Sequence, residues 1–77
     1  IYYETKIHWN GDLLVGRYEN EIEAAIAYNK AASTLLRKGY LKDYPVNYIE
    51  ELSDSEYRSR YQAVDISDKI KVLKSLL

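Results

Sequence analysis

Cysteine, methionine and phenylalanine are absent from this 77-residue chain, and proline occurs once. A chain without cysteine forms no disulfide and no cysteine-ligated metal site, which favours an intracellular location, whether nucleus, nucleoid or cytoplasm. No apolar run approaches the roughly 18 residues of a membrane-spanning helix, so we expect no membrane partner. A chain of this length allows one domain with one modest hydrophobic core.

Histidine and glycine are also scarce, which limits the chemistry that the chain can perform. His8 is the only histidine, so no second histidine or cysteine completes a transition-metal site, and no G-x-S-x-G motif supplies a nucleophile. The three glycines are too far apart for a phosphate-binding loop. Glu19, Glu21 and Glu23 cluster, but acidic residues are favoured at a helix N-terminus for electrostatic reasons. We therefore expect no enzyme, no metal and no cofactor.

Positive charge is not in excess either. Eleven Lys and Arg residues face twelve Asp and Glu residues, which gives a formal net charge of −1. Dedicated nucleic-acid binders are usually basic, because Lys and Arg neutralise phosphates. The overall charge thus argues against strong DNA affinity, and only an uneven distribution of charge would support it.

The first eighteen residues have the pattern of a β-hairpin. Residues 2–9 alternate between two faces, as a half-buried strand does. Asn10-Gly11 is a pair that a two-residue type I′ turn prefers, and Leu13 to Tyr18 should return antiparallel. The first strand then carries Tyr2, Glu4, Lys6 and His8 on its outward face, and Tyr3, Thr5, Ile7 and Trp9 on the other.

A long alanine-rich helix should follow the hairpin. Asn20 and Glu23 form a pair like a capping box, and the helix is predicted from about Glu21 to Lys38, with Gly39 as its stop. Alanine at high density lets a helix lie close against a sheet. The stripe predicted to face the sheet comprises positions 21, 25, 28, 32 and 35, including Ala25 and Ala32, with positions 24 and 31 beside it.

The remaining third of the chain predicts short helices. Residues 46–52 are predicted to form a short helical turn, and a second capping box opens a helix from Ser53 to about Ala63. Asp65 or Ser67 can cap a third segment, whose apolar stripe needs cover: either it packs back near Tyr57 and Tyr61, or it pairs with another copy or a protein partner. That stripe comprises Ile66, Ile70, Leu73 and Leu77, widened by Val72 and Leu76.

Together these patterns predict an α+β fold. A small antiparallel sheet, a β-hairpin of two strands or a sheet of three, packs on the long alanine-rich helix, and short C-terminal helices complete the domain. We expect residues 1–45 to form the hairpin–helix module and residues 46–77 a helical extension packed on the same domain.

The hairpin and helix together resemble a known family. Residues 14–18 (LVGRY) and 24–32 (AAIAYNKAA), followed by Asp43-Tyr44-Pro45, are similar to the third strand, helix and terminal motif of the AP2/ERF DNA-binding domain family. The resemblance covers Tyr2 to Pro45. It implies a non-enzymatic module that reads duplex DNA with the exposed face of its sheet, within a transcription factor, integrase or homing endonuclease.

The residues that the resemblance places at DNA are those of the outward hairpin face, and several depart from the family. The arginine-rich first strand of the family has no counterpart in residues 1–77. Lys6 and His8 stand where the family has Glu and Arg, and Asp12 and Leu14 where it has Arg and Trp. The alternative is an AP2-like module for protein–protein contact or oligomerisation, which Asp12 and the acidic balance favour. The candidate DNA-binding residues are Tyr2, Glu4, Lys6, His8, Asp12, Leu14 and Arg17.

Overall fold

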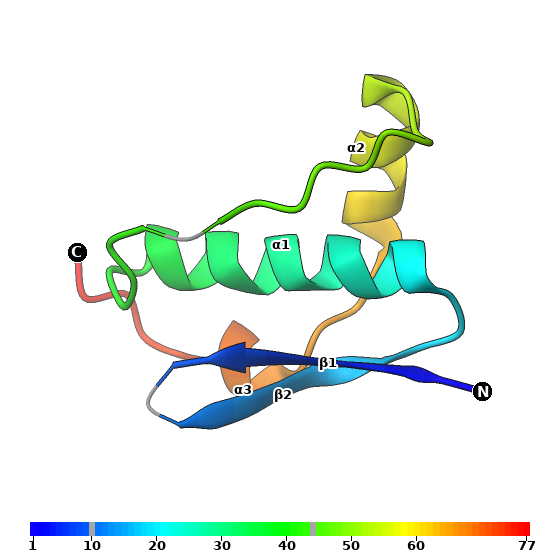
Figure 1. The fold of residues 1–77 in the computed structure, drawn as a ribbon. Helices are drawn as coiled ribbons and strands as arrows, with labels where there is room; N and C mark the ends of the chain where they lie inside the picture. Colours follow the sequence, from blue (N-terminus) through cyan, green and yellow to red (C-terminus); the bar gives the residue numbers. More distant parts are fainter. Residues whose placement is uncertain (10, 44) are drawn as a thin grey trace.

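The computed structural model describes residues 1–9, 11–43 and 45–77, and it shows the predicted α+β fold. A two-stranded antiparallel sheet packs on one side of a long helix, and two short helices follow in the C-terminal third (Figure 1). In the described residues no third strand joins the sheet. The elements are β1 (Tyr3–His8), β2 (Asp12–Tyr18), α1 (Glu21–Arg37), α2 (Asp54–Ala63) and α3 (Asp68–Lys71).

A β-bulge in β2 sets which side chains face the core. Thr5 pairs with Gly16 but Lys6 pairs with Leu14, so Val15 is the extra residue in the ladder. A bulge of this kind shifts the alternation of the strand by one position. Val15 is therefore buried together with Tyr18, three residues later, while the residues between them are less buried.

Gly16 allows the ring of Tyr18 to lie close to the strand. A Cβ atom at Gly16 would be 2.5 Å from the Tyr18 hydroxyl oxygen and 2.8 Å from its Cζ atom. In that position the Tyr18 hydroxyl donates a hydrogen bond to the Asp65 carbonyl oxygen at 2.6 Å. Burial, reinforced by the charges of Asp65 and Glu23, raises the pKa of Tyr18 above its ordinary value. The ring thus joins β2 to the C-terminal segment, 47 residues further along the chain.

The hairpin connection is one residue longer than predicted. The final pair of the ladder is His8 with Asp12, so residues 9–11 connect the strands, whereas a two-residue turn would pair Trp9 with Asp12. Trp9 has left the ladder and packs edge-on against Tyr40, with ring centroids 5.0 Å apart. Of the predicted turn pair, Asn10 lies outside the described residues, and Gly11 has the expected positive φ, +95°.

Replacing Gly11 by valine should destabilise the hairpin through the backbone alone. A Cβ atom at Gly11 would have no neighbour within 4 Å, so no steric clash contributes. The positive φ costs a residue with a branched side chain about 1–2 kcal/mol. We expect Gly11→Val to lower the free energy of unfolding by that amount in urea denaturation, and Gly11→Asn by less. Equal values for both variants would contradict this explanation.

Helix α1 begins and ends close to its predicted limits. The Asn20 side chain caps its first turn by accepting a hydrogen bond from the Glu23 backbone N–H at 2.8 Å. At the other end, Tyr40 N–H donates to the Leu35 carbonyl at 2.9 Å and Gly39 N–H to that of Leu36 at 3.1 Å. These two bonds form a Schellman motif, which accounts for the end of the helix.

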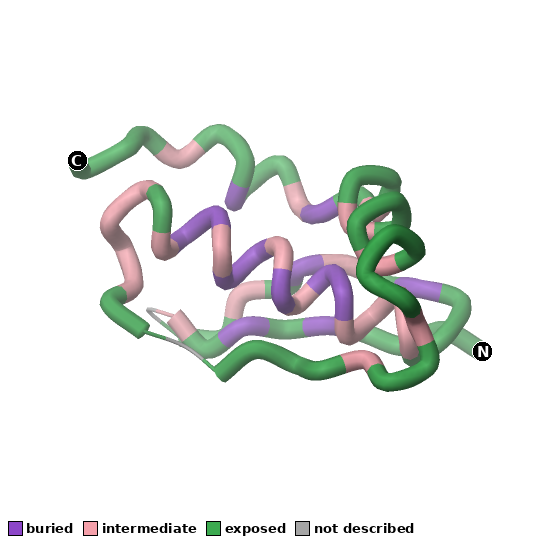
Figure 2. Tube along the Cα trace, turned by 90° about the horizontal axis from the view of Figure 1, so that it is seen from above, coloured by how far each residue is buried: buried purple, intermediate pink, exposed green. Residues whose placement is uncertain are grey.

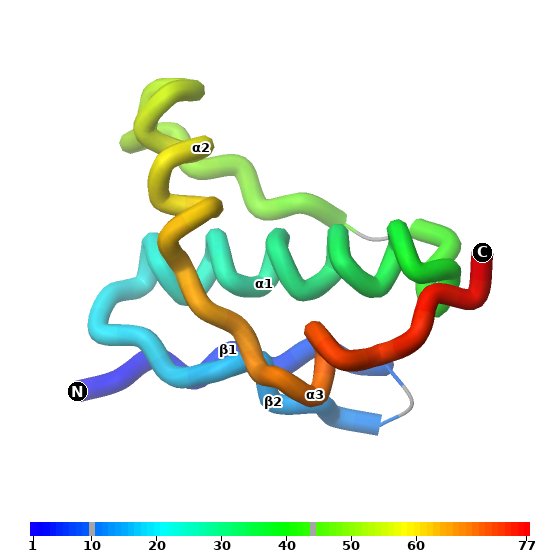
Figure 3. The backbone as a smooth tube through the Cα atoms, turned by 180° about the vertical axis from the view of Figure 1, so that it is seen from behind, coloured from blue at the N-terminus to red at the C-terminus, as the bar shows by residue number. Residues whose placement is uncertain are grey.

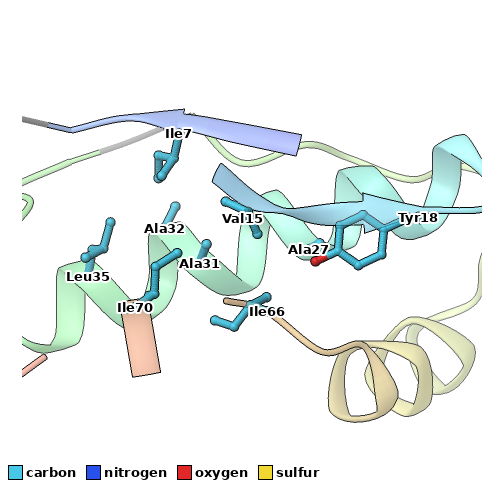
Figure 4. Packing of buried hydrophobic residues seen from close by; sticks show 9 residues of the cluster. All are labelled: Ile7, Val15, Tyr18, Ala27, Ala31, Ala32, Leu35, Ile66 and Ile70. Carbon is cyan, nitrogen blue, oxygen red and sulfur yellow. The ribbon is translucent and has the colours of Figure 1, made fainter. Parts of the chain in front are cut away.

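The buried face of α1 differs from the predicted stripe. Ala27 and Ala31 are fully buried in the core together with Ala32, whereas Ala25 is only half-buried and lies outside the core cluster. Figure 4 shows the reason. Two groups of side chains pack against α1: those of the strands, and Ile66 and Ile70 of the C-terminal segment. The helix is covered on two sides, so its buried face is wider than a sheet alone requires.

The helical turn predicted over residues 46–52 is much shorter in the structure: only residues 50 and 51 form a turn, which the Leu52 N–H closes by donating to the Ile49 carbonyl at 3.4 Å, and the residues before it have no regular structure. The Asn29 side chain holds this stretch by donating to the Asn47 carbonyl at 2.9 Å and accepting from the Asn47 N–H at 2.8 Å. Asn29 also donates to the Tyr57 hydroxyl at 3.0 Å. The backbone of the segment therefore pairs with α1, on the side away from the sheet (Figure 1). Of the family-like terminal motif that precedes it, Tyr44 lies outside the described residues.

Helix α2 agrees with its prediction, but the third helix is far shorter than its apolar stripe suggested. The capping box of α2 forms between Ser53 and Glu56. Helix α3 ends at Lys71. There the Lys38 ammonium donates hydrogen bonds to three backbone carbonyl oxygens, those of Ile70, Lys71 and Leu73, at 3.3, 2.7 and 2.6 Å.

Of the two predicted alternatives for the apolar C-terminal segment, the structure shows that it packs back on the domain. Its predicted position near Tyr57 and Tyr61 is wrong, because the segment lies along α1 beside β2 (Figure 3). Only part of its predicted stripe is covered. Ile66 and Ile70 are buried and Leu73 is partly buried, whereas Val72, Leu76 and Leu77 are exposed. The exposure pattern along the chain is drawn in Figure 2.

Candidate nucleic-acid interface

The outward face of the hairpin gathers the candidate residues into one surface. Three cross-strand pairs lie on it: Glu4 opposite Arg17, Lys6 opposite Leu14, and His8 opposite Asp12. All six residues are exposed, as is Tyr2, which precedes β1. No described helix covers this face, because α1 lies on the other side of the sheet (Figure 1). We call these six strand residues the hairpin face.

Glu4 is the electrostatic centre of the hairpin face. Its Oε1 atom lies 3.3 Å from the Lys6 ammonium, and its Oε2 atom accepts a hydrogen bond from Arg17 Nε at 3.3 Å. The hydrogen bond from Arg17, followed by that from Lys6, lowers the pKa of the Glu4 carboxyl below its ordinary value. The ionised carboxylate is thus favoured in the folded hairpin, and this contribution is lost as the pH falls through the lowered pKa.

The hairpin face carries both signs of charge in equal number. Lys6 and Arg17 supply two positive charges, Glu4 and Asp12 supply two negative ones, and the face is formally neutral with a neutral His8. The His8 Nδ1 atom lies 3.4 Å from an Asp12 carboxylate oxygen at the hairpin end, where both side chains are exposed. The surface is therefore patterned by charge and is not a uniformly basic patch.

The hydrogen bond from Arg17 to Glu4 uses one part of the guanidinium. In the described part of the chain its hydrogen bond to Glu4 is made by Nε, so the two terminal amino groups are not used in that bond. A guanidinium donates two parallel hydrogen bonds to a carboxylate, a phosphate or the O6 and N7 atoms of guanine. The hydrogen bond to Glu4 thus holds the Nε side of the Arg17 guanidinium and leaves its terminal amino groups outside that contact.

The strand bulge is what brings Arg17 to this face. Sequence alternation alone would give Arg17 the same side as the buried Val15, and the extra residue reverses its direction. The glycine at position 16 is the local signal for this irregularity. The position of Glu4 between Lys6 and Arg17 could not be predicted from the sequence, because the pairing of Glu4 with Arg17 depends on the register of the two strands.

A second concave region lies beside β2. It is an open hollow between the strand, the end of α2 and the segment that follows, lined among others by Tyr18, Arg60, Val64 and Asp65. A hydrogen bond from Lys71, 2.8 Å long, lowers the pKa of Asp65. Tyr18 and Asp65 thus use their polar groups in contacts within the chain.

Two further properties concern the described residues only. They contain no group of three or more His, Cys, Asp and Glu side chains placed to hold a metal ion. Among the helices that they form, none combines the length and the apolar character needed to cross a membrane.

The chain matches no protein-family model, no curated protein and no solved structure.

Proposed function

We propose that this domain is a non-enzymatic duplex-DNA-binding module and that the hairpin face is its DNA-contacting surface. The observation that carries the proposal is an uncovered two-stranded ribbon with Lys6 and Arg17 on either side of Glu4. The major groove of B-form DNA is wide enough to admit a two-stranded β-ribbon. The resemblance of residues 2–45 to the AP2/ERF family supports the same use of the sheet.

The ribbon is well supported from behind, as a reading surface requires. Ile7 and Val15 are buried between the strands and α1, and the Thr5 hydroxyl donates to the Ala24 carbonyl at 3.1 Å. Side chains on well-packed strands are positioned more accurately than those on loops. The hairpin face would therefore enter a groove with little rearrangement of its backbone.

Different residues take different roles in this proposal. Arg17 donates its terminal amino groups to a guanine, and Lys6 contacts guanine or a phosphate oxygen. Glu4 orients the Arg17 guanidinium and offsets part of the positive charge. A protein with a neutral face and few phosphate contacts has weak non-specific affinity, so we expect a shallow salt dependence, with a slope of roughly −0.9 per phosphate contacted.

Arg17→Ala tests the proposal against a matched control. A bidentate arginine–guanine contact discriminates by roughly 1–3 kcal/mol, so the variant should bind its preferred duplex about tenfold more weakly or worse. The measurement is fluorescence anisotropy with a duplex selected from a random pool at low salt. Arg58→Ala removes the same charge from α2, which is separated from the hairpin face by α1, and should leave the affinity unchanged.

Two results would contradict DNA binding by this face. One is the absence of any selected duplex at low salt, and the other is an equal loss of affinity in the Arg17 and Arg58 variants. The second candidate function is then protein contact through the same surface. It is favoured by the formal neutrality of the hairpin face and by Leu14, an apolar side chain that is 39% exposed opposite Lys6.

A further inference from the structure

The two edges of the sheet differ in whether another part of the described chain covers them. On the β2 side, Ser67 N–H donates to the Val15 carbonyl at 2.8 Å, and the segment leading into α3 lies beside the strand (Figure 3). On the β1 side, the described residues supply no pairing partner other than β2. The extended stretch after α1 runs above that helix and not in the plane of the sheet (Figure 1).

The free edge of β1 lacks several of the features that prevent strand pairing. Natural edges are blunted by proline, by bulges, by very short strands, by a covering segment or by charged side chains, and of these the described part of β1 carries the charges, Glu4 and Lys6. β1 has six residues without proline, and the single irregularity of the sheet places its extra residue in β2. An unpaired row of backbone N–H and C=O groups is therefore available for another strand.

The sequence of β1 is complementary to itself in one symmetric register. Two antiparallel copies related by a two-fold axis at Thr5 place each Glu4 opposite Lys6 of the other copy, and each Tyr3 opposite Ile7. An axis at Glu4 or at Lys6 would instead set two like charges directly opposite each other. Opposite charges across a strand pair stabilise it, whereas like charges destabilise it.

We propose that the free edge of β1 pairs antiparallel with β1 of a second copy of this chain, with the two-fold axis at Thr5. The two hairpins then form one four-stranded sheet in the order β2, β1, β1, β2. Both hairpin faces lie on the same side of that sheet, and both α1 helices on the other. Tyr3, which is 43% exposed in the single chain, gains cover from the second copy. This inference does not depend on DNA binding.

Charge reversal tests the register directly, and sedimentation equilibrium without DNA is the measurement. Lys6→Glu sets Glu4 of one copy against the introduced carboxylate of the other, so the dissociation constant of the dimer should rise about tenfold or more. Glu4→Lys should do the same by setting two ammonium groups opposite each other. The double variant, Glu4→Lys with Lys6→Glu, restores opposite charges across the interface and should restore the dimer. Circular dichroism establishes that each variant is folded, since exposed ion pairs contribute little to stability.

Hydrogen exchange at two protein concentrations locates the interface. Every second amide of β1, those that point away from β2, should be protected at high concentration and lose protection on dilution, because the other β1 amides already bond to β2 within one chain. Arg58→Glu, on α2, should leave both readouts unchanged. A chain that remains monomeric at millimolar concentration would overturn the proposal. So would a dimer insensitive to both single reversals. Protection of the amides that point away from β2 that does not vary with concentration would also overturn it, because the edge would then be covered within one chain.

Discussion

Ile70→Ala is expected to remove most of the stability of this domain. Ile70 is fully buried in the core cluster with Ile66, next to Leu35 of α1 (Figure 4). Truncating a buried isoleucine to alanine costs about 2–5 kcal/mol, because apolar contacts are lost and a cavity remains. A core of this size rarely supplies more than about 3–5 kcal/mol. Thermal denaturation followed by circular dichroism should therefore show a strongly lowered midpoint or no folded baseline.

Val72→Ala is the matched control for this variant. Val72 lies two residues further along the same segment and is 75% exposed, so its truncation should change the free energy of unfolding by less than about 0.5 kcal/mol. Similar midpoints for the two variants would mean that the C-terminal segment does not complete the core. The contrast thus tests whether the domain requires residues beyond its hairpin and long helix.

Ala31→Leu should have the second large effect. Ala31 is fully buried on the face of α1 that meets the core, between Ala27 and Leu35. Alanine allows the helix to approach the strands closely, and a larger side chain forces backbone shifts that cost about 1–3 kcal/mol or more. Urea denaturation should show this loss, whereas Ala63→Leu, at the exposed end of α2, should be nearly neutral.

A neutral Ala31→Leu variant would contradict the close packing of α1. Ala25→Leu then distinguishes the observed buried face from the stripe predicted by periodicity. Ala25 is half-buried outside the core cluster, so we expect a smaller loss there than at position 31. The reverse order would favour the predicted stripe over the observed one.

The local elements of this protein were predictable because their signals act over three or four residues. Asn20 caps α1 through the N–H of Glu23, and Ser53 forms its capping box with Glu56, as their spacing predicted. Gly11 has the positive φ expected at the hairpin connection. In each case the interacting groups are close in sequence, so their chemistry determines the local conformation wherever the element lies.

The composition of the hairpin face was predictable for a related reason, but its electrostatics were not. Alternation along β1 places Glu4, Lys6 and His8 on one side, and this follows from the sequence period alone. The ion pair between Glu4 and Arg17 depends on the strand register, which the bulge at Val15 shifts. Alternation along β2 alone would have placed Arg17 on the side of the buried Val15, so the sequence did not indicate which residue would face it.

The sequence by itself thus determined the hairpin, the limits of α1 and its caps, and the outward side of β1. Only the tertiary structure decided which face of α1 is buried and against which elements the apolar C-terminal residues pack. Ile66 and Ile70 reach the core more than thirty residues after the alanines that they contact, and Lys38 ends α3 by binding its carbonyl groups. Such contacts depend on the competition between distant segments for the same apolar surface, and periodicity within one helix carries no information about that competition.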